Sequence, residues 1–89
     1  MFERVESLIG SDNLEKIKKK TVLVLGIGGV GGYVVESLVR CGISNIIIVD
    51  HDIVDETNLN RQIIALNSTI GKKKVDVMEE RIKNINKEC

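Results

Sequence analysis

A glycine-rich turn between two apolar patterns is the feature that most constrains this chain. Gly26, Gly28 and Gly31 stand in G-x-G-x-x-G register, directly after an apolar run at residues 22–25. In such a turn the first glycine allows the tight bend, the second lets the backbone approach a phosphate, and the third lets helix and strand pack closely. A helix beginning near Gly29 would point its free N–H groups and positive dipole end at an anion. The turn therefore predicts a nucleotide-binding unit, and the alternative is a tight turn that binds nothing.

Two strands flank this turn and its helix. They are predicted at Thr21–Leu25 and at residues 45–50, and a crossover helix between them makes the pair parallel. The expected apolar face of that helix contains Val30, Val34, Val35 and Leu38. Asp50 closes the second strand, where its carboxylate can accept hydrogen bonds from a ribose. The predicted fold class is α/β, the N-terminal part of a Rossmann-like doubly wound parallel sheet with a βαβ unit and flanking helices.

The length sets a limit on this sheet. A chain of 89 residues is shorter than the usual domain of about 100–150 residues, and it offers only two clear strands. Parallel strands ordinarily lie in a larger sheet that is covered on both faces. We therefore expect residues 1–89 to be the N-terminal part of a longer nucleotide-binding domain, with an apolar edge that associates with further structure.

The flanking segments read as helices and one loop. Residues 2–20 predict two short helices separated at Gly10, with Ser11 or Asp12 capping the second. Its lysine-rich end reads either as a solvated helix terminus or as a basic patch for RNA. Residues 51–70 predict a functional loop with a helical turn, and residues 71–86 predict an amphipathic helix.

Composition excludes several function classes. Thirteen basic and thirteen acidic residues cancel, so no global field favours nucleic acid or a membrane surface. No apolar run approaches the ~20 residues of a membrane span. Cys41 and Cys89 have neither metal-binding nor redox spacing, which indicates a reducing, cytoplasmic location. Cys41, on the crossover helix, is expected to be a packed core thiol.

The residues after Asp50 help to choose the nucleotide. The glycine motif alone fits NAD, FAD, S-adenosylmethionine and ATP equally. Arg61 and Lys74 add two positive charges beyond the backbone amides, and that number suits a triphosphate. The alternatives are a surface ion pair between Arg61 and a nearby carboxylate, and an exposed position for Lys74 among its neighbouring lysines.

Three stretches together resemble one superfamily. LGIGGVGG, IIIVDHDIVDETNLNRQ and STIGKKKVDVMEERIKNIN are similar to the ThiF/MoeB/ubiquitin-activating-enzyme superfamily, whose members adenylate a carboxylate with ATP. The similarity covers the whole chain. Within the superfamily, the sequence NRQIIAL most resembles the tRNA threonylcarbamoyladenosine dehydratases, which activate and cyclise N6-threonylcarbamoyladenosine in tRNA. The resemblance implies an ATP-binding ThiF-type domain over residues 1–89, with a helical segment at 1–20.

The resemblance also implies roles for individual residues. It places the nucleotide against the glycine turn and its ribose on Asp50, with Asp52 near the site. It assigns the phosphates to Asn58, Arg61 and Lys74, the last two as catalytic residues. Arg4 matches the superfamily arginine that reaches the triphosphate of the partner subunit in a homodimer. The Mg²⁺ ligand of the superfamily has no counterpart in residues 1–89, so no metal-binding residue is predicted here.

Other functions are also compatible with the sequence. Within the superfamily, the alternative substrate is a ubiquitin-like sulfur carrier protein of the ThiS or MoaD type. An NAD-dependent oxidoreductase would fit the glycine motif alone, although Arg61 and Lys74 argue against it. The non-enzymatic alternative is a nucleotide-binding fragment without catalytic activity that assembles through its open sheet.

Overall fold

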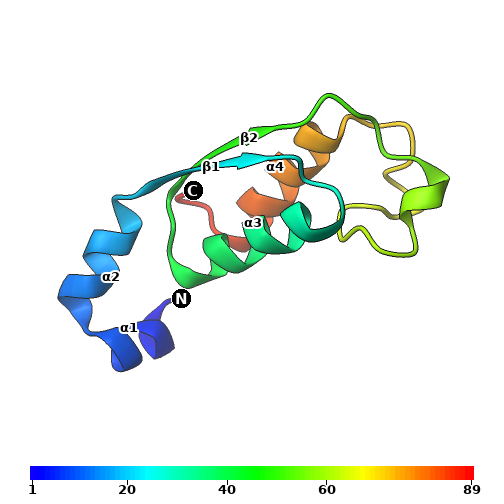
Figure 1. The fold of residues 1–89 in the computed structure, drawn as a ribbon. Helices are drawn as coiled ribbons and strands as arrows, with labels where there is room; N and C mark the ends of the chain where they lie inside the picture. The colour runs from blue at the N-terminus through cyan, green and yellow to red at the C-terminus, as the bar shows by residue number, and fades with distance from the viewer.

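A computed structural model describes residues 1–89 and shows a short parallel sheet beside helices (Figure 1). Strands β1 (Thr21–Leu25) and β2 (Asn45–Val49) are joined by helix α3 (Gly29–Cys41). They pair in parallel, with Thr21 opposite Asn45 at one end and Leu25 opposite Val49 at the other. The predicted α/β class and βαβ unit are confirmed, and the second strand ends one residue before Asp50.

One face of the sheet forms the core. Val22, Val24, Ile46 and Ile48 alternate along the strands toward α3 and toward α4 (Lys74–Ile85), and both helices lie on that side of the sheet. The core side chains of the helices include Val35, Val39, Met78 and Ile82. Arg81 of α4 binds Glu36 of α3 at 2.6 Å from Nη2 and 2.8 Å from Nε, which ties the two helices together.

The opposite face of the sheet is open. The side chains that point away from the core are apolar and more than half exposed: Leu23 57%, Leu25 74%, Ile47 53% and Val49 51%. An exposed apolar surface of this kind is typical of a sheet that packs against further structure.

The predicted apolar face of α3 is correct for Val35 and Leu38, which lie in or against the core, and wrong for Val30 and Val34. Val30 is 79% exposed and Val34 is 41% exposed, whereas Gly32, Val35 and Val39 are buried. Gly32 permits close packing on this side, because a Cβ there would lie only 2.9 Å from the carbonyl oxygen of Ile27. The prediction for Cys41 was also wrong, since its side chain is exposed at the end of the helix.

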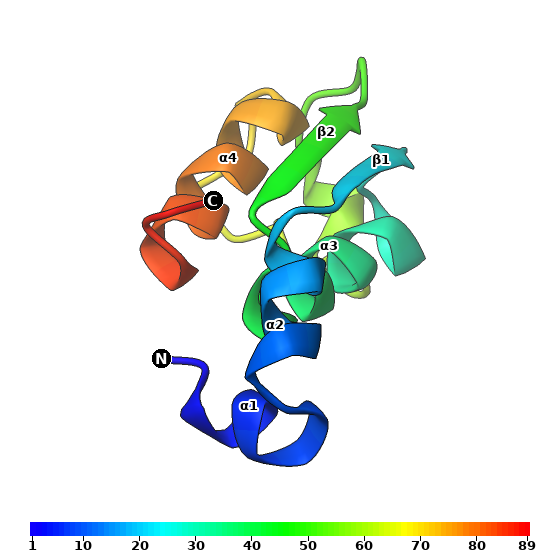
Figure 2. The same cartoon turned by 90° about the vertical axis from the view of Figure 1, so that its left-hand side faces the viewer.

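The N-terminal segment forms two helices that project from one end of the sheet (Figure 2). Helix α1 (Glu3–Ile9) has no buried residue, and α2 (Ser11–Lys18) buries only Leu14. The capping prediction was wrong, because Ser11 already lies inside α2 and Gly10 precedes it with no side-chain cap. Lys18 pairs with Glu15 at 3.6 Å.

The segment between β2 and α4 is held by an antiparallel ladder. The N–H of Val54 donates to the Lys72 carbonyl at 2.8 Å, the N–H of Gly71 donates to the Val54 carbonyl at 2.8 Å, and Ile53 bridges Lys73. Helix α4 therefore begins at Lys74 and not at residue 71 as predicted. The predicted helical turn is present as the 3-10 helix η1 (Glu56–Asn58). None of the helices is long and apolar enough to cross a membrane.

Candidate functional site

The glycine-rich turn lies at the carboxyl ends of β1 and β2, which is where open α/β sheets bind their ligands. Gly26 has φ +82°, a conformation that side chains other than glycine rarely adopt. A Cβ at Gly31 would lie 1.8 Å from the carbonyl oxygen of Gly26. The third glycine therefore lets the first turn of α3 pack directly on the bend that precedes it.

The start of α3 presents unpaired N–H groups. The first backbone donor of the helix is Gly32, which donates to the Gly28 carbonyl at 3.2 Å. The N–H groups of Gly29, Val30 and Gly31 therefore have no acceptor within the helix. Together with the positive end of the helix dipole, they form a place where an anion is stabilised.

Asp50 connects this turn to the end of β2. Its Oδ2 accepts from the N–H of Ile27 at 3.0 Å, and its Oδ1 accepts from the N–H of Asp52 at 2.8 Å. Burial raises the pKa of Asp50, but the N–H groups of Ile27 and Asp52 and the charge of Lys74 outweigh it, so the pKa lies below its ordinary value. Asp50 thus stays ionised and holds the turn while each oxygen keeps a further lone pair for a ligand.

Lys74 is buried beside Asp52 at the first residue of α4. Its exposed fraction is 5%, and its Nζ lies 3.8 Å from Oδ2 of Asp52. The backbone adds to this link, because the N–H of Lys74 donates to the Asp52 carbonyl at 3.1 Å. The alternative of one exposed lysine among three is wrong for Lys74, although Lys72 and Lys73 are exposed.

Asn58 is a buried part of a capping box. Its Oδ1 accepts from the N–H of Asp55 at 2.8 Å, while Oδ2 of Asp55 accepts from the N–H of Thr57 at 2.9 Å. The hydroxyl and N–H of Thr57 lower the pKa of Asp55 below its ordinary value. This reciprocal bonding fixes the turn that leads into Arg61.

Arg61 is exposed and makes no ion pair. Its Nη1 donates to the carbonyl of Thr57 at 3.1 Å and to Oδ1 of Asn60 at 3.0 Å. The alternative of a surface ion pair with a neighbouring carboxylate is therefore wrong in this structure. Nε and Nη2 of the guanidinium remain available for an anionic ligand.

Arg4 is not brought to this site. It lies on α1, at the opposite end of the molecule from the glycine turn and the loop after β2 (Figure 1). Within one copy of the chain, the structure collects the glycine turn with Asp50, Asp52 and Lys74, and it leaves Arg4 apart.

Gln62 is a residue of this site for which the sequence predicted no role. Its exposed fraction is 8%, and its side-chain amide lies against Gly28, 3.0–3.1 Å from where a Cβ would stand. The only sequence signal is its place directly after Arg61 in N-x-x-R-Q. That pattern does not show that Gln62 meets the glycine turn.

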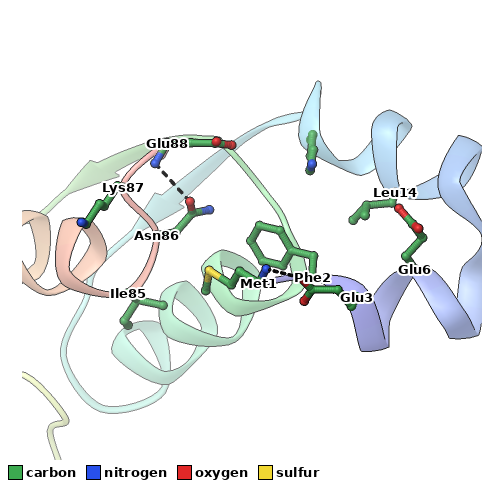
Figure 3. A pocket seen from close by; sticks show the side chains of 10 residues that line it. Met1, Phe2, Glu3, Glu6, Leu14, Ile85, Asn86, Lys87 and Glu88 are labelled. Carbon is green, nitrogen blue, oxygen red and sulfur yellow. Dashed lines mark hydrogen bonds and ion pairs between the residues drawn. The ribbon is translucent and has the colours of Figure 1, made fainter.

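A hollow lies at the end of the molecule away from the glycine turn (Figure 3). It has a volume of about 510 Å³, between the start of the chain and the end of α4, and its lining includes Phe2, Leu14, Ile85 and Asn86. It is lined by none of the residues predicted to bind nucleotide.

Comparison with known proteins gives consistent matches. The ThiF family model matches residues 3–89. The tRNA threonylcarbamoyladenosine dehydratase of Bacillus subtilis is 53% identical over 88 residues, which are 99% of this chain and 35% of that protein. The Haemophilus influenzae enzyme of the same name is 46% identical over 99% of this chain and 34% of its own length. The chain thus spans about a third of the length of the curated relatives it matches.

A solved structure matches the fold over the same extent. The Escherichia coli tRNA N6-threonylcarbamoyladenosine dehydratase TcdA in complex with ATP superposes with a TM-score of 0.96 at 44% identity, covering 99% of this chain and 36% of that chain. The fold is thus that of part of the TcdA Rossmann-like domain. Since the family model covers nearly every residue, the chain belongs to the ThiF family.

Proposed function

We propose that the chain is the N-terminal part of an ATP-binding, ThiF-type adenylating domain. The observation that carries this proposal is the group of unpaired N–H donors at the start of α3, with ionised Asp50 and buried Lys74 close to the same strand ends. ATP is bound by a relative of 44% identity in a solved complex that this chain matches throughout.

In this proposal each residue has one task. The backbone of Gly26, Gly28, Gly29 and Gly31 receives the phosphates, and Asp50 accepts hydrogen bonds from the ribose hydroxyls. Asp52 holds Lys74 in place. Asn58 fixes the loop from which Arg61 reaches the phosphates.

Arg61 and Lys74 are the proposed catalytic residues. Carboxylate attack on the α-phosphate breaks the bond to the β-phosphate, and the pyrophosphate leaves with added negative charge. Lys74 and Arg61 stabilise that charge. Mg²⁺ would balance charge on the triphosphate, but the chain contains no cluster of three acidic, histidine or cysteine side chains that could hold the ion.

The proposed substrate of the whole protein is the threonyl carboxylate of N6-threonylcarbamoyladenosine in tRNA, which is activated and then closed to a cyclic product. The names of the relatives that match 99% of this chain support it. We also propose a cytoplasmic homodimer in which Arg4 serves the site of the partner subunit. Its exposed position far from its own glycine turn supports that placement.

The second candidate substrate is a ubiquitin-like carrier protein. A probable molybdopterin-synthase adenylyltransferase of Gracilaria tenuistipitata is 37% identical over 91% of this chain, and the ubiquitin-like modifier-activating enzyme 5 of Bombyx mori is 43% identical over 84%. Identity is lower and coverage shorter than for the three bacterial tRNA enzymes, which are at least 46% identical over 99% of this chain, so this candidate ranks second.

One experiment separates the two substrates. The whole protein is incubated with ATP, Mg²⁺ and tRNA bearing threonylcarbamoyladenosine, and the digested tRNA is analysed by mass spectrometry for loss of one water. ATP–pyrophosphate exchange is measured in parallel with a ubiquitin-like carrier. Cyclic product is the expected result. Exchange that depends on the carrier, without cyclic product, would move the proposal to the second candidate.

A further inference from the structure

The side-chain amide of Gln62 is buried without a hydrogen-bond partner. The residue is 8% exposed, and its Oε1 is fully enclosed and makes no hydrogen bond. Its backbone is well held, because its N–H donates to the Asn58 carbonyl at 2.9 Å and its carbonyl accepts from Ala65 at 3.0 Å. Buried polar atoms in native proteins are nearly always paired, so an unpaired amide in a fixed segment calls for an explanation.

The unpaired amide of Gln62 lies beside the glycine turn. Nε2, Cδ and Oε1 of Gln62 all lie 3.0–3.1 Å from the place of a Cβ on Gly28, so the plane of the amide rests on the residue that precedes α3. Next to it are the unpaired N–H groups of Gly29, Val30 and Gly31. The two observations are independent, and both point to a ligand at the same place.

The groups around the Gln62 amide indicate which kind of ligand would bind there. Unpaired N–H groups and a helix N-terminus attract an oxyanion, and Arg61 directly precedes Gln62 on the same segment. The Nε2 of Gln62 is the amide atom nearest the place of a Cβ on Gly28, at 3.0 Å. An amide nitrogen is a donor, and an oxyanion over Gly28 can accept from it.

We propose that Gln62 is a phosphate-binding residue of the nucleotide site, in which its Nε2 donates to a phosphate oxygen seated over Gly28. This inference rests on the proposed nucleotide site and adds a contact to it. This role also explains why position 62 holds a glutamine. A leucine of similar size would fill the same space without leaving an unpaired polar atom. Gln62 thereby joins the segment of Arg61 to the glycine turn through the bound phosphate.

The test compares ligands in the whole protein with Gln62→Leu, which keeps the volume and removes both polar atoms. ATP and adenosine affinities are measured by isothermal titration calorimetry, and melting is measured without ligand. We expect ATP affinity to fall about tenfold or more, as for loss of one hydrogen bond to a charged group. Adenosine affinity should stay unchanged within error, and the melting temperature should not fall, because the variant removes an enclosed unpaired atom.

Asn86→Leu is the matched control. Asn86 is 3% exposed and has an unpaired Nδ2, but it lines the distant hollow (Figure 3). We expect its ATP affinity to equal that of the wild type. Gln62→Glu, which places a carboxylate against the phosphate, should weaken ATP more than Gln62→Leu does, again without an equal loss for adenosine.

The outcomes are distinguishable. Unchanged ATP affinity in Gln62→Leu, or equal losses for ATP and adenosine, would overturn the role of Gln62. If Gln62→Leu fails to fold, the comparison of ATP with adenosine in Gln62→Glu decides the question in the same way. Failure of the wild type to bind ATP would instead overturn the proposed function itself.

Discussion

At the carboxyl ends of β1 and β2, polar contacts join residues that are far apart in the sequence, whereas in α1 and α2 they join near neighbours. Ile27 meets Asp50, Asp52 meets Lys74, and Gln62 lies on Gly28. In the N-terminal helices the contacts are local, such as Ser7 to Glu3 and Asn13 to Ile9.

Burial differs in the same direction. The loop and helix around the candidate site bury charged and polar side chains, whereas the N-terminal helices bury one leucine. One end of the molecule is therefore held together by contacts between segments that are distant in the sequence, whereas the N-terminal helices at the other end are an appendage. Substitutions at the two ends should therefore have very unequal effects.

The largest effect is expected for Gly31→Ala. Its Cβ would lie 1.8 Å from backbone at Gly26, which cannot yield as a flexible side chain would. The free energy of unfolding, measured by urea denaturation, should fall by about 4 kcal/mol or more. Gly10→Ala is the control at the other end. It has φ +87° and open space around its Cβ, so its loss should be only about 1–2 kcal/mol. Equal losses would contradict the comparison.

A smaller effect is expected for Lys74→Ala in the whole protein. Loss of a buried charge beside the proposed phosphate site should lower ATP-dependent turnover about 10- to 100-fold, the equivalent of one charge-assisted hydrogen bond. Lys72→Ala removes an exposed lysine two positions earlier and should stay within about twofold of the wild type. If both variants lost activity equally, burial would not distinguish these lysines.

The third effect depends on pH. The folded-state pKa of Asp50 is lowered, so its charge stabilises the fold above the pKa of the unfolded chain, and this stability is lost as pH falls through the folded-state pKa. Asp50→Asn keeps one acceptor and should cost about 1 kcal/mol near neutral pH. Denaturation between about pH 6 and pH 3 should show that this difference shrinks. A constant difference would show that the charge does not stabilise the turn.

The smallest effect is expected for Leu8→Ser. Leu8 lies on α1 and is 87% exposed, so the free energy of unfolding should change by less than about 0.5 kcal/mol. Leu14→Ala, in the same pair of helices, removes a buried side chain and should cost clearly more. A large loss in Leu8→Ser would mean that α1 packs against structure in solution, and the view of it as an appendage would fail.

Local patterns predicted the βαβ unit well. The apolar runs predicted both strands to within one residue. Gly26 ends the first strand sharply, whereas no glycine follows the second, and its end was misplaced by one residue. The acid at the end of the second strand was also found, since its position follows from the strand itself.

Contacts across long sequence distances could not be predicted. The apolar residues of α3 lie on two sides of the helix, and which side is buried depends on its packing against the sheet and α4, where Gly32 approaches Ile27 closely. The burial of Lys74 depends on the ladder between Ile53 and Lys73, and three consecutive lysines gave no sign of it. The contact between Gln62 and Gly28 likewise arises only when the loop folds back on the turn.

The links around the glycine turn have a consequence for synthesis of the chain. They join residues 27 and 50, 28 and 62, and 52 and 74, so the last of them must wait until Lys74 has left the ribosome. Contacts of such long sequence separation form late in folding, after the loop-closure entropy has been met. A bound phosphate would then stabilise only chains that have closed every link. Nucleotide in the cell would thus stabilise chains that have completed these contacts and not nascent chains that still lack them.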